Sequence, residues 1–236
     1  MKNTIKTIAL GALCTSLAFV SFNASAALIS FDDDQRLQDG TVWYGGTGGT
    51  LGGRGIDFHS ILGVDTPSND GNSLVCIRCE LNFQTGNNIT EGQTTGIWTF
   101  AGGGSLVITG RVETQGGGLI ADGTLASGSF TEALVFGGGS TLTLSGLGVD
   151  EKNRGLIEYF GLGPDFTFAS TQIALGTVDF YPCNGITPST PSECGGFSGT
   201  VTNADFDNMA VPVPAAVWLF GSGLLGLVGI ARRRKA

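Results

Sequence analysis

Histidine is nearly absent from this chain of 236 residues, and its only representative is His59. A serine hydrolase needs a histidine base beside an activated serine, and the chain has no Gly-x-Ser-x-Gly motif to supply that serine. The sequence therefore argues against this class of enzyme.

A glycoside hydrolase needs a pair of carboxyl groups whose pKa values are pushed apart by their surroundings. By residue type alone, the candidates for such a pair are Asp32, Asp33, Asp34, Asp205 and Asp207. Their sequence setting singles out no pair, because acidic residues are common throughout the middle of the chain. We therefore expect a noncatalytic protein that carries no cofactor.

Basic residues are scarce between the two ends of the chain. Lys2, Lys6 and the four-residue basic cluster at the C-terminus take half of the 12 basic residues, whereas all 20 acidic residues lie between Asp32 and Asp207. The part between the ends thus has 6 basic residues and a net charge of −14. Such a charge argues against nucleic acid as a partner and favours solubility.

The N-terminus has the three parts of a secretory signal peptide. Lys2 and Lys6 precede an apolar stretch at 8–20, and the small residues at 24–26 form a cleavage site. We expect signal peptidase to remove residues 1–26, which exports the rest of the chain across the inner membrane. The exported domain would then cover residues 27–210.

The C-terminus combines an apolar segment with a basic end. Residues 215–231 contain no charge, and as a helix they would be about 25 Å long, which is the short end of what spans a bilayer and predicts a marginal single span. The cluster Arg232, Arg233, Arg234 and Lys235 follows directly. By the positive-inside rule this cluster stays in the cytoplasm, so the domain before the span lies on the outer side.

The segment 211–236 resembles a PEP-CTERM sorting domain of the VPLPA type. The matching residues are Val211, Pro212, Val213, Pro214 and Ala215, followed by the Gly-rich apolar stretch 218–227 and by Arg232, Arg233 and Arg234. The resemblance implies that exosortase, a membrane protease-transpeptidase of Gram-negative bacteria that make exopolysaccharide, recognises the proline motif. It would remove the helix and release or transfer the protein to the cell surface. Val213 replaces the Glu of the family's Pro-Glu-Pro motif. The alternative to a sorting signal is a plain C-terminal membrane anchor that is not processed.

The exported domain shows the two-residue period of strands rather than the period of helices. Within 74–83, one parity contains Val75, Ile77, Cys79, Leu81 and Phe83, and the other contains Cys76, Arg78 and Glu80. Similar short segments lie at 97–100, 106–112, 134–136, 141–145, 166–168, 172–180 and 197–202. Many short strands with frequent turns indicate an antiparallel β-sandwich or barrel.

Short segments rich in glycine, asparagine or aspartate mark the expected chain reversals. These are the Gly-Gly-Gly segments at 102–104, 116–118 and 137–139, the Asn pair at 87–88, and Asp122-Gly123. One short helix is predicted, with Asp150 as its N-cap, Leu156, Ile157 and Phe160 on one face, and Gly161 as its end.

Four cysteines remain after removal of the signal peptide, and an even number in an exported chain predicts disulfides. The short separation of Cys183 and Cys194 favours a bond between them. Cys76 and Cys79 would point to opposite faces of a regular strand, so a bond between these two requires a bulge or turn. An oxidising compartment argues against a zinc site, and no metal site is predicted.

These observations predict an exported, noncatalytic protein of the cell surface or of an exopolysaccharide (biofilm) matrix. The alternative is a carbohydrate-binding module, whose candidate stacking residues are Trp43, Tyr44, Trp98 and Tyr181. Ice binding is a lesser alternative, because Thr141 with Thr143 and Thr200 with Thr202 would each present hydroxyl groups on one strand face.

Overall fold

The computed structural model describes residues 27–33, 40–46, 48–90, 97–138, 141–163, 166–180 and 195–209, with the backbone alone for 166–180. The expected signal peptide and the sorting segment 211–236 lie outside these residues. Among the residues that the model describes, no helix is long and apolar enough to cross a membrane.

The described chain is mainly β, as the sequence predicts, and all of its strand pairs are antiparallel. It contains one short helix, which follows the seventh strand. In chain order the elements are β1 (Leu28–Asp32), β2 (Thr41–Tyr44), β3 (Thr50–Val64), β4 (Ser73–Asn87), β5 (Ile97–Glu113), β6 (Leu119–Gly138), β7 (Thr141–Lys152), α1 (Arg154–Phe160), β8 (Phe166–Phe180) and β9 (Phe197–Met209).

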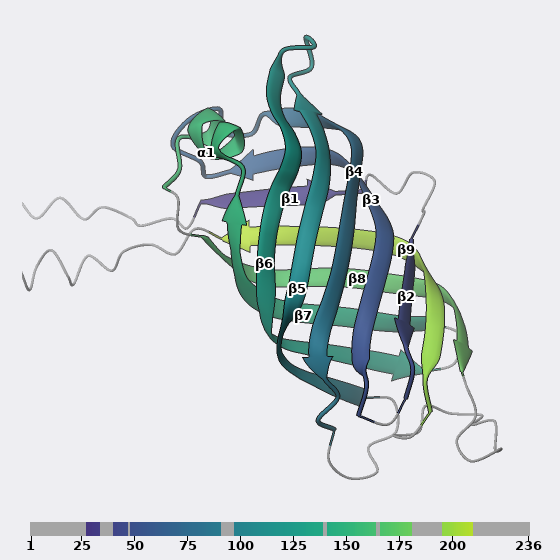
Figure 1. Cartoon of the computed structure of the whole chain (residues 1–236). Helices are drawn as coiled ribbons and strands as arrows, with labels where there is room; N and C mark the ends of the chain where they lie inside the picture. Colours follow the sequence, from purple (N-terminus) through teal and green to yellow (C-terminus); the bar gives the residue numbers. More distant parts are fainter. Residues whose placement is uncertain are drawn as a thin grey trace, which may run out of the picture.

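The nine strands form one sheet, and its ends meet. Each strand from β3 to β9 pairs with the next along the chain, and β1 and β2 both lie between β3 and β9. β1 pairs with the C-terminal part of β3, at residues 60–64, whereas β2 pairs with 51–54. The two short strands therefore share one of eight positions around a closed sheet. In Figure 1 the front strands β3 to β6 cross the back strands β7 to β9 steeply.

The two-residue period of the sequence decides which side chains point into the closed sheet. In β7, Leu142 and Leu144 are buried, whereas Thr141 is exposed and Thr143 is half-buried. An apolar side chain that is buried in this way contributes roughly 1.5–3 kcal/mol relative to an exposed one. The interior is thus a packed core, to which each strand whose side chains are described contributes.

Aromatic side chains fill much of this interior. Near β2, the ring of Tyr44 packs edge-on against Phe100, with 5.1 Å between centroids, and Trp98 lies 5.1 Å from Phe197. Near β1, Phe31 packs against Phe58 and Phe206 at 5.7 and 5.8 Å. The interior therefore has a β2 half and a β1 half, since β1 and β2 sit at opposite ends of one position.

Several strand predictions need correction. β1, β2 and β3 were not predicted, and the expected reversals at Gly102–Gly104 and at Asp122-Gly123 lie inside β5 and β6. A register shift occurs at the first place, between Gly103 and Leu106 of β5, so these glycines make a bulge that bends a long strand rather than a turn. Asp122 and Gly123 instead pair in regular register with Arg111 and Gly110 of β5. The Gly116–Gly118 segment is a turn as predicted, closed by a 2.9 Å hydrogen bond from the Gly117 amide to the Thr114 carbonyl.

The predicted helix exists, but its N-cap is Asn153 rather than Asp150. The Asn153 side chain accepts a hydrogen bond of 2.9 Å from the Gly155 amide, and Gly161 ends the helix with a left-handed φ of 69°. Asp150 belongs to β7 and is buried. Leu156 and Phe160 are buried, as predicted, and they pack α1 onto the hydrophobic core.

Candidate functional site

Cys76 and Cys79 form a disulfide, with 5.6 Å between their Cα atoms. The bulge that such a bond requires is present, because the register of β4 shifts between Ile77 and Glu80 and Arg78 has a φ of 50°. The bulge also reverses the predicted alternation. Cys76 and Cys79 both point inward, whereas Ile77, which was predicted to share a face with Cys79, is partly exposed.

The outer surface over β2 to β5 is hollowed into a groove beside Trp43. The Trp43 indole is 42% exposed, and it lies across Gly52 of the neighbouring strand. A Cβ atom on Gly52 would come within 2.6 Å of the indole, so only glycine allows the ring to lie there. The Trp43 groove is lined by Trp43, Gly53, Arg54, Asn82, Phe83, Gln84, Ser105 and Val107.

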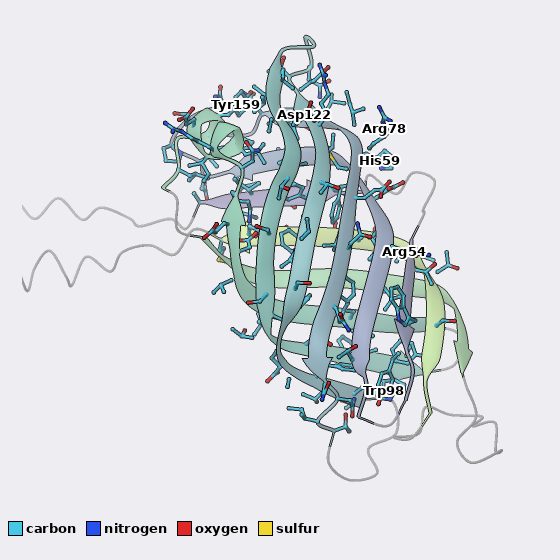
Figure 2. All side chains as sticks on the ribbon, in the orientation of Figure 1. Arg54, His59, Arg78, Trp98, Asp122 and Tyr159 are labelled. Atoms are coloured by element: carbon cyan, nitrogen blue, oxygen red, sulfur yellow. A yellow bond between two sulfur atoms is a disulfide. The ribbon has the colours of Figure 1, made fainter. Side chains whose placement is uncertain are left out.

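Polar side chains surround the exposed indole in this groove. The Gln84 amide nitrogen donates a 2.8 Å hydrogen bond to the Thr50 hydroxyl, and the Asn82 carbonyl oxygen accepts one of 3.1 Å from the Gly55 amide. These bonds orient both amides. Arg54 is exposed, and Figure 2 shows it on β3 beside β2. The Trp43 groove thus combines one aromatic face with several hydrogen-bonding groups.

A second groove continues from the Trp43 groove across β5, because both contain Ser105 and Val107. Its outward residues on β6 and β7 include Ser127, Ser129 and Glu151. Together the two grooves cross the outer face from β2 to β7.

Two of the four predicted stacking residues are wrong. Tyr44 and Trp98 are almost completely buried and pack against Phe100 and Phe197. Their burial follows from strand parity, since Tyr44 lies one residue after the outward-facing Trp43. Tyr181 lies outside the described residues.

Three of the candidate acidic residues, Asp32, Asp205 and Asp207, meet on the outer face of β1 and β9, and Asp34 lies outside the described residues. Asp32 is the register partner of Asp205, and the Ser30 hydroxyl donates a 2.6 Å hydrogen bond to Asp207. Burial raises the pKa of Asp205, and the neighbouring Asp32 and Asp207 carboxylates raise it further. Asp33 is buried and accepts a 2.8 Å hydrogen bond from the Ala204 amide. Among the described residues, no three His, Cys, Asp or Glu side chains are arranged to hold a metal ion.

A polar cluster that the sequence analysis missed lies inside the β1 half of the closed sheet. Asp150 and Lys152, both on β7, form an ion pair whose side chains are completely buried. The Lys152 Nζ atom also donates a 2.6 Å hydrogen bond to the Asn208 Oδ1 atom on β9 and lies 5.6 Å from the centroid of the Phe206 ring. Continuing the alternation of Leu142 and Leu144 to the end of β7 would have identified both charged residues as inward.

Burial dominates the proton equilibria of this cluster. It raises the pKa of Asp150 and lowers the pKa of Lys152 to about 8, and their mutual attraction only partly opposes both shifts. Both groups are therefore pushed toward their neutral forms.

The other predicted sites are not brought together. Val211, Pro212, Val213, Pro214, Ala215 and Arg232 to Arg234 lie outside the described residues, as do Cys183 and Cys194. The threonine pairs lie on β7 and β9, with β8 between them, and Ala174 of β8 is the register partner of Thr143. The four threonines therefore do not form a continuous array.

Comparison with known proteins gave no match to a family model, to a curated protein or to a solved structure.

Proposed function

We propose that this chain is an exported, noncatalytic protein of the cell surface or of an exopolysaccharide matrix, and that its closed sheet binds a glycan chain along the outer grooves. The observation that carries the glycan assignment is the Trp43 indole, which has one side against Gly52 and the other in the groove. Sugar rings present apolar C–H faces and polar edges. A flat aromatic ring surrounded by amide, guanidinium and hydroxyl groups is complementary to both.

The surroundings of the indole support a binding role rather than a catalytic one. Residues that reach the Trp43 groove, such as Arg54, Asn82, Gln84 and Ser105, are hydrogen-bonding groups, and none is a carboxylic acid. Glycoside hydrolysis uses two carboxyl groups across the scissile bond. The acidic residues of β1 and β9 lie on other strands than this groove.

Glycan binding is tested by measuring affinity for purified exopolysaccharide of the producing bacterium, and for cellulose, chitin and dextran, with the full chain extracted in detergent. We expect binding to at least one polymer, with a shift in tryptophan fluorescence. Trp43→Ala should weaken the binding about 30-fold, which corresponds to the ~2 kcal/mol of a central aromatic contact.

Phe136→Ala is the matched control, because Phe136 is 41% exposed on β6 and lies outside both grooves. This variant should keep its affinity within about twofold, as expected for a residue outside the contact. Equal losses in the two variants, or no binding to any of the polymers, would contradict the glycan assignment.

Delivery to the surface is a separate part of the proposal, and it depends on the sorting segment 211–236. If the segment is a recognition motif, Pro212 and Pro214 should favour an extended chain that a protease can bind, because proline disfavours both helix and sheet pairing. In a host with exosortase, the double variant Pro212→Ala/Pro214→Ala should accumulate as membrane-bound, full-length protein on immunoblots of cell fractions. If the variant is processed like the wild type, the segment is a plain anchor.

A further inference from the structure

Lys152 is the only lysine between residues 27 and 210, since the other three are Lys2, Lys6 and Lys235. Lysine is among the residues that are least often fully buried. Here its side chain has no exposed surface. The single lysine of this domain therefore lies inside the hydrophobic core, and this unusual position needs an explanation.

The atoms around the Lys152 amine are arranged for a reaction with Asn208. The amine nitrogen lies 2.6 Å from the Asn208 Oδ1 atom, which is bonded to the side-chain amide carbon. The Asn208 Nδ2 atom donates a 3.2 Å hydrogen bond to the Phe206 carbonyl oxygen. Both hydrogen bonds are consistent with the same assignment of the amide oxygen and nitrogen of Asn208. They hold the amide carbon of Asn208 close to the Lys152 amine.

Asp150 completes the arrangement. One of its carboxylate oxygens, Oδ2, contacts the Lys152 amine directly. The other, Oδ1, is buried and has no hydrogen-bond partner among the described residues. A carboxylate in this position can take a proton from the amine and deliver it to the amide.

We propose that Lys152 and Asn208 join in an intramolecular isopeptide bond, with Asp150 as the catalytic residue that carries the proton. This cross-link is a modification that the folded chain makes on itself. It does not depend on the proposed glycan binding, because the three side chains are buried inside the sheet, although Asp150 belongs to a strand position that borders the second groove.

The reaction is balanced without any other reactant. The Lys152 ammonium gives one proton to the Asp150 carboxylate, and the neutral amine then attacks the Asn208 amide carbon. Asp150 gives its proton to the amide as the tetrahedral intermediate forms, and the amine nitrogen loses a second proton to Asp150. The bond from the amide carbon to Nδ2 breaks, and that nitrogen leaves as ammonia. Asp150 ends as the neutral acid, and nothing is oxidised or reduced.

The surroundings favour each step. Burial pushes Lys152 toward the neutral amine that can attack and Asp150 toward the neutral acid that can donate. Fixed geometry replaces the entropy loss of an encounter between free groups. The apolar interior, with Phe206 under the amine, keeps water away from the reacting carbon.

The bond would connect strands that are not neighbours. β8 lies between β7 and β9 in the sheet, so a bond from Lys152 to Asn208 joins β7 to β9 across the interior. The bond would hold the strands of the β1 half together covalently, so this half of the sheet could not open without breaking a bond.

Intact-mass spectrometry of the full chain under denaturing conditions tests the bond. The wild type should be lighter than its sequence mass by one ammonia molecule, in addition to any loss from disulfides and from the signal peptide. Peptide mapping should find residues near Lys152 and Asn208 in one branched peptide. Asn208→Ala and Lys152→Met should each have the mass of their own sequence.

Asn203→Ala is the matched control, because it removes an amide from the outer face of the same strand, where its nitrogen contacts Asp205. This variant should still lose ammonia. Asp150→Asn should slow the loss by at least about 10²-fold, the usual contribution of a positioned proton carrier. The proposal is overturned if the wild type has its unmodified mass, if it loses water in place of ammonia, or if Asn208→Ala still loses ammonia.

Discussion

The β2 half and the β1 half of the interior are both filled by buried side chains, but the chemistry of those side chains differs. Around β2, the core is made of large rings such as Trp98, Phe100 and Phe197, and the described side chains there include no buried charge. Around β1, rings of the same kind surround an ion pair, Asp150 and Lys152. Both halves are buried to the same degree, so solvent access does not explain the ion pair.

This difference indicates that the ion pair serves something other than packing. Taking two charges out of water costs several kcal/mol each, and replacing a buried pair by apolar side chains is often neutral or stabilising. The β2 half shows that apolar side chains can fill this closed sheet. The charges of the β1 half are therefore better explained by reactivity, as in the proposed cross-link, than by stability.

The largest expected effect comes from opening a cavity in the β2 half. Trp98→Ala should lower the free energy of unfolding by about 3–5 kcal/mol, because it removes a large buried ring and the strands around it relax only partly. The measurement is a guanidinium unfolding curve of the full chain in detergent. A loss below about 1 kcal/mol would mean that the rings of this half are not tightly packed.

An intermediate effect is expected when the β1 half is made apolar. In Asp150→Val/Lys152→Met both charges are removed together, so neither is left unpaired. If the isopeptide bond exists, the variant should lose about 2 kcal/mol, since the bond closes a long loop worth about 4 kcal/mol and relief from desolvation offsets part of that.

The sign of this change sharpens the comparison between the halves. Without a covalent bond, the same variant should be at least as stable as the wild type, because relief from desolvation exceeds the roughly 1 kcal/mol lost with the Lys152 hydrogen bond to Asn208. Unfolding curves of the wild type and the double variant under the same conditions decide between the two. Asn203→Ala is the control, because it changes a polar side chain on the outer face of β9 and leaves the Asp150–Lys152 ion pair unchanged.

The smallest effect is expected on the outer face of β9, beside the β1 half. Burial and neighbouring carboxylates raise the folded-state pKa of Asp205, so the folded protein binds more protons there than the unfolded chain. This contribution to stability is present below the ordinary aspartate pKa and is lost as the pH rises through the folded value. Asp205→Asn should therefore stabilise the protein at pH 7, by less than about 1 kcal/mol after solvent screening.

The same substitution should have almost no effect near pH 3, where Asp205 is protonated in both states. Urea midpoints at the two pH values measure the difference. A larger stabilisation at low pH than at pH 7 would show that the charge of Asp205 is favourable in the folded protein.

The strand pattern of β7 was predicted only in part. Thr141 to Ser145 was predicted as a strand because its alternation is regular, and the structure extends this strand to Lys152. The extension was missed because glycines at 146 and 148 carry no side chain to show the period. Asp150 was then taken as a helix cap, since an aspartate before a short helix has the same local appearance as one at the end of a strand.

β3 shows the opposite failure. Its first half contains Gly52, Gly53 and Gly55, which suggest a loop when the sequence is considered alone. In the structure Gly52 and Gly53 leave room for the rings of Trp43 and Phe83, which come from other strands. The reason for these glycines lies in their neighbours, so local propensity could not reveal it. Trp43 was one of four candidate stacking residues, and strand parity leaves its side chain exposed.

The amino-acid pattern is enough to predict an antiparallel β domain, because a two-residue period buries apolar side chains on one face only in a strand. It also predicts that a helix ends at Gly161, because that position needs a left-handed backbone. The closure of the single sheet and the contact between Lys152 and Asn208 depend on the tertiary fold. These residues are 56 positions apart, and no local pattern relates them. They meet because β7 and β9 flank β8 and because their inward faces share one core from which water is excluded.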